Sequence, residues 1–128
     1  MPTWSEYREI ARSRGALAYQ LFAVASQPSA PHEQMQEILP RHLAYQKQME
    51  AEGKLFLAGP LSDHTGTEMS GAGLLIYRVA DIDEARTIAE KDPMHKEGGR
   101  TFTIQAWLVN EGALNFQLRL SEQKAALD

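Results

Sequence analysis

The sequence predicts an α+β fold, and two observations support this prediction. Short apolar runs with the two-residue periodicity of strands alternate with longer segments whose apolar residues recur every three to four positions, as in helices. Glycine and proline mark the boundaries between most of these segments. With 128 residues, the whole chain (1–128) is expected to form a single domain, because two domains would be too small to hold separate cores.

The predicted core, at about residues 16–110, has the order strand, helix, strand, strand, helix, strand. The strands are expected at 16–25, 54–58, 73–79 and 101–109, and the helices at 32–52 and 81–91. Pro40 interrupts the first helix, so we expect a short helix at 32–38 and a longer one at 40–52, with a single kinked helix as the alternative. The second helix is expected to end at Asp92-Pro93.

This order is the split βαβ arrangement of ferredoxin-like folds, in which two helices cover one face of a four-stranded antiparallel sheet. Strand 16–25 is largely apolar on both of its faces, which requires a cover on both sides. The helices supply only one cover, and a bare apolar face on a small protein indicates an interface. We therefore predict a homodimer in which two sheets pack face to face.

Two segments extend this core. Residues 4–13 form a predicted amphipathic helix that ends at Gly15 and packs on the domain or on a partner subunit. The C-terminal extension, 111–128, has apolar residues that alternate as in a strand, and its end at 121–128 is polar and expected to be frayed. The alternating residues are Leu114, Phe116, Leu118 and Leu120.

Composition excludes several functions. The net charge is −4 and the 13 lysines and arginines are scattered along the chain, so no basic surface for nucleic acid is predicted. The chain has no cysteine, which excludes disulfides, thiolate nucleophiles and cysteine-based zinc sites. The N-terminal residues are charged and the apolar runs are shorter than a membrane span, so we expect a cytoplasmic protein that does not bind membranes.

His42 is the first candidate for chemistry. At 100° per residue it lies within the apolar arc formed by Ile38, Leu39 and Met49, which is the buried side of its helix. Histidine is the side chain best suited to act as a general acid or base near neutral pH. The alternative interpretation is a core histidine that is hydrogen-bonded to a backbone carbonyl.

Asp92 is the second candidate. It follows the last turn of a helix, where the macrodipole disfavours a carboxylate, so a nearby cation is expected to offset that cost. The alternative is an aspartate that only turns the chain before Pro93. Because the two helices of a split βαβ fold run side by side, His42 and Asp92 could meet, and the aspartate would then fix the tautomer of the histidine.

Three more residues are candidates for binding a small-molecule substrate. His95 lies close to the Asp-Pro pair, Arg41 could hold an anionic group, and Ser62 precedes Asp63 and His64 in a loop that could reach a pocket. The histidines lack the spacing of a metal site, so we expect no metal. The sequence has no phosphate loop, dinucleotide fingerprint or nucleophile elbow, so we expect no cofactor.

Several short motifs within residues 16–110 resemble those of the YciI-like (YCII-related) family. The motifs are Arg41-His42-Leu43-Ala44-Tyr45, Glu52-Gly53-Lys54-Leu55, Ala58-Gly59-Pro60-Leu61, Gly73-Leu74-Leu75-Ile76, Asp92-Pro93 and Trp107. The resemblance implies a ferredoxin-like fold that dimerises into an α+β barrel. It also implies an active-site His–Asp pair, which falls on His42 and Asp92.

Three functions remain open from the sequence. The first is a cofactor-free lyase or isomerase that acts on a small molecule, with His42 as general base and Asp92 orienting it. The second is a non-catalytic dimeric module that holds a metabolite in the same cleft, and the third is a cofactor-free oxygenase of the same barrel type. A hydrogen bond between His42 and Asp92 beside a pocket would favour the first over the second.

Overall fold

The computed structural model describes residues 1–127, so the expectation for Asp128 lies outside the described residues. The chain forms two compact units. The larger unit is Gln20–Trp107, and the smaller combines Met1–Tyr19 with the segment from Leu108 onward. Every residue of the predicted site belongs to the larger unit. No helix within residues 1–127 combines the length and the apolar character needed to cross a membrane.

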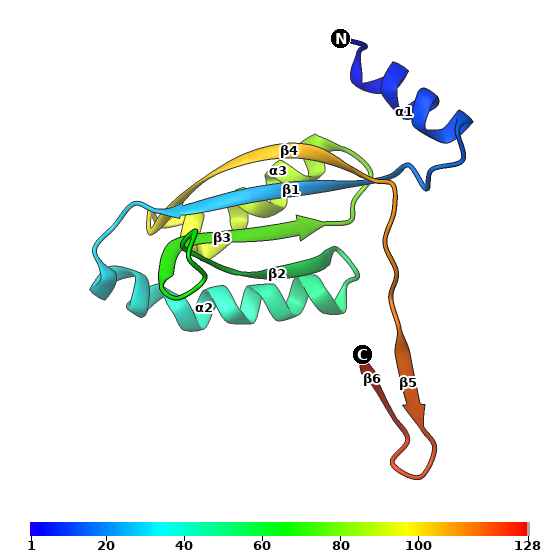
Figure 1. Cartoon of the computed structure of the whole chain (residues 1–128). Helices are drawn as coiled ribbons and strands as arrows, with labels where there is room; N and C mark the ends of the chain where they lie inside the picture. Colours follow the sequence, from blue (N-terminus) through cyan, green and yellow to red (C-terminus); the bar gives the residue numbers. More distant parts are fainter. Residues whose placement is uncertain (128) are drawn as a thin grey trace. The chain divides into compact units, whose positions relative to one another are not determined.

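The core of the larger unit is a four-stranded sheet with the strand order β2-β3-β1-β4. β1 is antiparallel to β3, and β3 is antiparallel to β2. The predicted ferredoxin-like α+β fold is therefore confirmed (Figure 1). The elements are β1 (Tyr19–Pro28), α2 (His32–Ala51), β2 (Leu55–Ser62), β3 (Met69–Tyr77), α3 (Ile82–Lys91), α4 (Pro93–Lys96) and β4 (Arg100–Val109).

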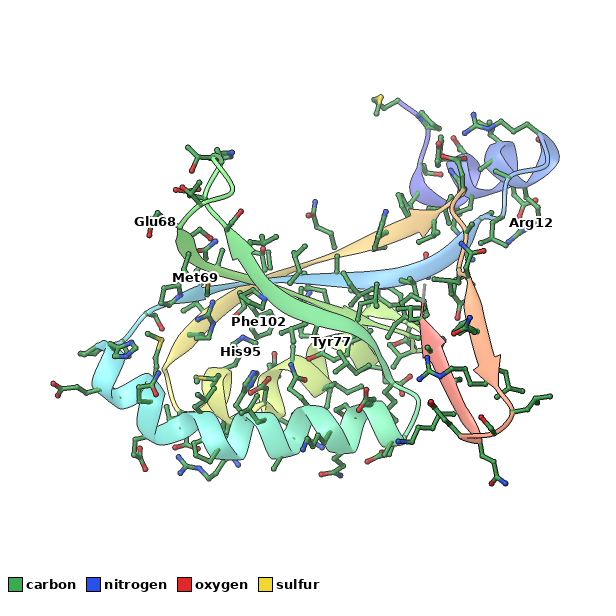
Figure 2. All side chains as sticks on the ribbon, turned by 60° about the horizontal axis from the view of Figure 1, so that its bottom comes forward. Arg12, Glu68, Met69, Tyr77, His95 and Phe102 are labelled. Carbon is green, nitrogen blue, oxygen red and sulfur yellow. The ribbon has the colours of Figure 1, made fainter. Side chains whose placement is uncertain are left out.

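The two long helices of this unit lie on the same side of the sheet, and Figure 2 shows Tyr77 and Phe102 between the sheet and this helical layer. The buried core forms between the two layers because alternate residues of each strand point toward the helices. The opposite sheet face carries Ala23 and Ala25, which are only partly buried. The core residues are Phe22, Val24, Met49, Leu75, Tyr77, Ala85, Ile88 and Ala89.

α2 is one continuous helix, so the predicted break into helices 32–38 and 40–52 is wrong. Pro40 has no N–H to donate to the carbonyl of Gln36 one turn earlier. Both residues are exposed, so water can hydrate that carbonyl and the helix continues.

β2 and β3 are longer than predicted. β2 does not end at Gly59-Pro60 but continues to Ser62. It lies at the edge of the sheet, where a proline can face away from the ladder without losing a hydrogen bond. β3 begins at Met69, inside the predicted loop 61–71. The two strands therefore form a longer hairpin than their side-chain pattern indicates.

α4 is a single helical turn that the sequence reasoning missed. Pro93 occupies its first turn, and the side chain of Asp92 accepts a hydrogen bond from the backbone N–H of Met94. The preceding helix, α3, begins at the expected place, where the side chain of Asp81 accepts a hydrogen bond from the N–H of Glu84.

The smaller unit contains α1 (Trp4–Ser13), β5 (Phe116–Arg119) and β6 (Lys124–Leu127). The predicted helix 4–13 is confirmed, and it begins with a capping box formed by Thr3 and Glu6. β5 pairs with β6 in an antiparallel hairpin, so the prediction of a frayed end is wrong for residues 124–127. The polar residues of the segment 121–128 lie mostly in the turn before this strand, whereas residues 125–127 are Ala-Ala-Leu, so the polarity assigned to the whole end does not describe β6.

The first strand also begins later than predicted, at Tyr19 rather than at residue 16. Ala18 has a φ of 50°, which lies in the left-handed region and is incompatible with a strand. Ala16 and Ala18 instead pack with Ala11 and Leu108 in a small apolar cluster of the smaller unit.

Candidate functional site

His42 projects from the middle of α2, on the same helix face as the buried residues Ile38 and Met49. The spacing of four and seven residues places these three side chains above one another. The side chain of His42 is 18% exposed, and it lines a cavity between α2 and the sheet. It is therefore held by the core and also accessible to a small molecule.

Asp92 lies at the junction of α3 and α4 and is fully buried. Its carboxylate accepts the N–H of Met94 at 3.0 Å, so it caps α4. The same carboxylate accepts a hydrogen bond from Nδ1 of His42, at 2.7 Å from Oδ1 and 2.9 Å from Oδ2. Asp92 thus both turns the chain before Pro93 and contacts His42, because one carboxylate has enough lone pairs to accept from both donors.

This geometry fixes the tautomer of His42. An ionised carboxylate only accepts hydrogen bonds, so the proton shared with Asp92 belongs to Nδ1 of His42. In the neutral imidazole, Nε2 then carries a free lone pair. Because His42 lines the cavity, that nitrogen can accept a proton from a molecule bound there.

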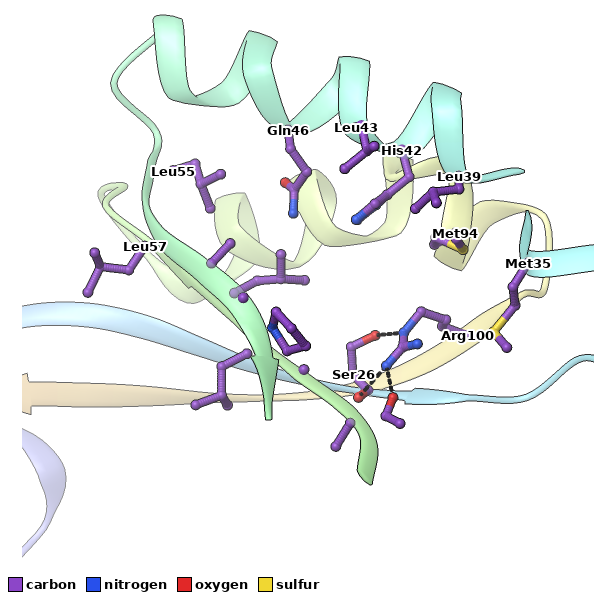
Figure 3. A pocket seen from close by; sticks show the side chains of 18 of the residues that line it. Ser26, Met35, Leu39, His42, Leu43, Gln46, Leu55, Leu57, Met94 and Arg100 are labelled. Carbon is purple, nitrogen blue, oxygen red and sulfur yellow. Dashed lines mark hydrogen bonds between the residues drawn. The ribbon is translucent and has the colours of Figure 1, made fainter. Parts of the chain in front are cut away.

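The cavity has a volume of about 870 Å³, which suits a small organic molecule. Figure 3 shows Leu39, Leu43 and Gln46 on the α2 side with His42, and Ser26 and Arg100 on the sheet side. Apolar side chains form most of the wall. They include Met35, Leu39, Leu43, Leu55, Leu75 and Met94.

Gln46 lies four residues after His42 on α2 and lines the same cavity. Its Oε1 atom is buried, and none of the residues 1–127 donates a hydrogen bond to it. Buried polar atoms usually have a partner, so this oxygen, which is closed off from the cavity, is an unsatisfied acceptor among the described residues.

Arg100 is the first residue of β4 and projects into the cavity wall. Its Nε donates to Oγ of Ser26 at 2.8 Å. Its Nη2 donates to the backbone oxygens of Ser26 at 3.0 Å and of Gly71 at 2.5 Å. Gly99, directly before it, packs so closely against Ile38 and Met94 that a Cβ there would lie 3.1 Å from Ile38 Cδ1. The absence of a side chain at Gly99 therefore lets the chain pass close to Ile38 and Met94 directly before Arg100.

His95 lies behind Ser26 and is not in the wall of the cavity. Its Nδ1 donates to the carbonyl of Ala89 at 2.8 Å, and its Nε2 is 2.9 Å from Oγ of Ser26. Burial lowers the pKa of the His95 imidazole below its ordinary value. In the neutral form, Nε2 accepts the hydroxyl proton of Ser26, and Oγ of Ser26 accepts the N–H of Arg100. The three side chains form one directed hydrogen-bond chain.

Two buried tyrosines lie near the pair. Burial, together with the charge of Asp92, raises the pKa of Tyr45 to about 12, and its hydroxyl donates to the carbonyl of Ile88. The same causes raise the pKa of Tyr77 above its ordinary value. The hydroxyl of Tyr77 has no hydrogen-bond partner in the described part of the chain. Both phenols are therefore neutral near pH 7.

The remaining predicted residues lie elsewhere. Arg41 is exposed and pairs with Glu97 at 2.6 Å and Glu37 at 3.4 Å, so it does not line the cavity. Ser62 is exposed, and its hydroxyl donates to the adjacent carbonyl of Asp63. The structure thus brings His42 and Asp92 together and leaves Arg41 and Ser62 outside. No group of three metal-ligating side chains occurs within residues 1–127.

Sequence reasoning missed Ser26, Gln46 and Arg100. Gln46 had a usable signal, because a residue four positions after His42 lies on the same helix face. Arg100 and Ser26 had none, since they are separated by 74 residues and meet only through the pairing of the sheet.

The chain belongs to the YCII-related domain family, whose model matches residues 18–107. It is 31% identical over 76 residues, which cover 59% of this chain and 82% of the relative, to the uncharacterized protein YjpA of Bacillus subtilis strain 168. A solved structure is also similar, with a TM-score of 0.53, 26% identity and coverage of 67% of this chain and 92% of the other. That protein is 5-chloro-2-hydroxyhydroquinone dehydrochlorinase (TftG) from Burkholderia phenoliruptrix AC1100, in complex with 2,5-dihydroxybenzoquinone.

Proposed function

We propose that the protein is a cofactor-free enzyme of the lyase or isomerase type, in which His42 takes a proton from a small molecule in the cavity. One observation carries this proposal. The Nδ1–H of His42 is held by a fully buried carboxylate, while the histidine lines a cavity large enough for a substrate. A base with a fixed tautomer beside a substrate cavity is the arrangement that proton transfer requires.

In the proposed step, Nε2 of His42 accepts a proton bonded to a carbon or oxygen atom of the substrate. In an isomerisation, the electron pair of the broken bond shifts within the substrate, and the imidazolium returns the proton to another atom. In an elimination, the same pair forms a new double bond and expels a leaving group. Asp92 stays ionised and stabilises the imidazolium in both cases.

The structural similarity supports this reaction class. The similar solved structure is named as a dehydrochlorinase, a name that describes the removal of hydrogen chloride, and it was solved with a hydroxylated quinone. The cavity of this chain has largely apolar walls with a few polar groups, which suits a substituted ring. The hydrogen bond between His42 and Asp92 beside the cavity favours an enzyme over a binding module.

The test is a turnover screen of halogenated hydroquinones, hydroxyquinones and lactones with the wild type and with His42→Ala. Loss of a general base is expected to reduce the turnover rate by about 10²- to 10⁴-fold. His64→Ala is the matched control, because His64 lies in an exposed turn outside the cavity. If His42→Ala keeps the full rate on a substrate that the wild type converts, the proposal fails. Tight binding of these compounds without turnover would support the binding module instead.

We also propose that two chains pair through the sheet face opposite α2 and α3. Alternation along the strands places apolar side chains on this face, and three of them are exposed: Leu57 (56%), Leu74 (37%) and Trp107 (45%). Light scattering at micromolar concentration is expected to give the mass of a dimer. Ala25→Arg is expected to give a monomer because it places a charge in the same face, whereas Glu90→Arg on α3 is expected to leave the dimer intact.

A further inference from the structure

Arg100 is a partly buried cation with no carboxylate partner. Its three hydrogen bonds go to a hydroxyl oxygen and two backbone carbonyl oxygens, all of them neutral. It forms no ion pair with any carboxylate of residues 1–127. A charge taken out of water is costly unless a counter-charge accompanies it. The arrangement is therefore electrostatically incomplete as it stands.

No carboxylate among the described residues that lie near the cavity forms an ion pair with Arg100. Asp92 is close enough for its charge to act on Arg100, but its carboxylate is engaged by His42 and by the N–H of Met94. Glu50 also lines the cavity, but it is exposed on α2 and forms no ion pair with Arg100. Within residues 1–127 no carboxylate pairs with Arg100, which leaves its counter-charge to solvent ions or to a molecule in the cavity.

The guanidinium group has donors left for such a molecule. It carries five N–H groups, and Nε and Nη2 use the three described above. The two N–H groups of Nη1 have no acceptor within the described residues. Because three fixed contacts hold the guanidinium plane in place, these two donors are oriented before a ligand arrives, which lowers the entropic cost of binding.

Ser26 and His95 act as positioning residues for this group. The hydroxyl of Ser26 can turn, and it would offer Arg100 either its proton or a lone pair. Donation to Nε2 of His95 directs a lone pair toward Nε of Arg100. The carbonyl of Ala89 in turn holds the proton of His95 on Nδ1. The direction of the whole chain is thus set by one backbone carbonyl, which can only accept.

We infer that Arg100 binds an anionic oxygen of the ligand, so that the cavity selects small organic anions, in which an apolar body carries a carboxylate, phenolate or enolate group. The apolar walls would hold the body. This inference names the substrate class for the proposed function and rests on the same cavity. It does not depend on proton transfer by His42.

The test compares benzoate with benzamide, which have nearly the same shape and differ in charge. Titration calorimetry, or NMR for weak binding, is expected to show that the wild type binds benzoate about 10- to 100-fold more tightly than benzamide, because the bond to Arg100 is charge-assisted. Arg100→Gln is expected to bring this ratio close to one, and Arg100→Lys to keep part of it. Arg86→Gln is the matched control, since Arg86 is exposed on α3 and the variant has the same change in net charge.

A second measurement needs no variant and therefore does not depend on how well Arg100→Gln folds. The Nε–H proton of Arg100 is held by Ser26 and should give a resolved NMR signal, which benzoate is expected to shift and benzamide to leave in place. A wild type that does not discriminate, an unchanged ratio in Arg100→Gln, an equal loss in Arg86→Gln or an unmoved signal each overturns the inference. His42→Ala should keep the ratio, so a failure of the proposed catalysis is distinguishable from a failure of anion recognition.

Discussion

The helical wall and the sheet wall of the cavity hold a charge in different ways. Behind the helical wall, the charge of Asp92 is matched by two donors, one from His42 and one from the backbone of α4. On the sheet wall, the charge of Arg100 is held only by neutral oxygens. The first arrangement is complete without a ligand and the second is not. The two proposals rest on this difference, with proton transfer proposed for the helical wall and anion binding for the sheet wall.

The largest effect is expected on the helical wall, from Asp92→Ala. This change leaves the N–H of Met94 and Nδ1 of His42 without their acceptor in a fully buried position. Urea unfolding is expected to show a loss of about 3–5 kcal/mol of stability. Asp92→Asn should recover much of it, because an amide oxygen can accept from the same donors. A loss below about 1 kcal/mol for Asp92→Ala would show that the two donors find other partners.

The matching change on the sheet wall is Ser26→Ala. It removes the group that joins Nε of Arg100 to Nε2 of His95, and Ser26 is buried. The expected loss of unfolding free energy is about 1–3 kcal/mol, the usual cost of leaving buried polar groups unpaired. Ser121→Ala, in the exposed turn between β5 and β6, is the control and should change stability by less than about 0.5 kcal/mol. Equal losses in the two variants would contradict a specific role for Ser26.

A smaller effect is expected from the pH dependence of His95, which lies behind the sheet wall and contacts Ser26. Burial lowers the pKa of His95, and the nearby His42 and Arg100 lower it further. The carbonyl of Ala89 and the charge of Asp92 raise it, but by less. The unfolded chain therefore binds more protons than the folded one below the ordinary pKa of 6.5, so this contribution to stability falls as the pH drops below that value. His95→Gln should lose less stability between pH 7.5 and 5.5 than the wild type does. An identical dependence of stability on pH in the wild type and in His95→Gln would contradict this prediction.

The smallest effect is expected for Tyr77→Phe, in the buried core between the sheet and the helices. The hydroxyl of Tyr77 is buried without a partner among the described residues, so its removal takes away an unpaired polar group. The variant is expected to be as stable as the wild type or up to about 1 kcal/mol more stable in urea unfolding. Tyr45→Phe is the comparison, because its hydroxyl does have an acceptor, Ile88. A large loss in Tyr77→Phe would show that its hydroxyl has a role that the contacts do not reveal.

Local signals predicted the helical wall well. Periodicity placed His42 on the buried face of α2, and the Asp-Pro pair marked the end of α3, so both residues could be named before their contact was seen. The same local rules failed at Pro40, where an exposed carbonyl lets the helix continue. They also failed at residues 124–127, where polar residues at 121–124 obscured an Ala-Ala-Leu segment that pairs with β5.

The sequence by itself determined the order of strands and helices and the two residues of the candidate base, because these depend on contacts and periodicities within a few residues along the chain. Only the tertiary structure decided the sheet wall. Ser26, Gly71 and Arg100 come from three different strands, and Arg100 could not be distinguished from the exposed Arg41 by composition or spacing. An arginine acquires its role from the acceptors that surround it, and the acceptors of Arg100 come together only when the sheet forms.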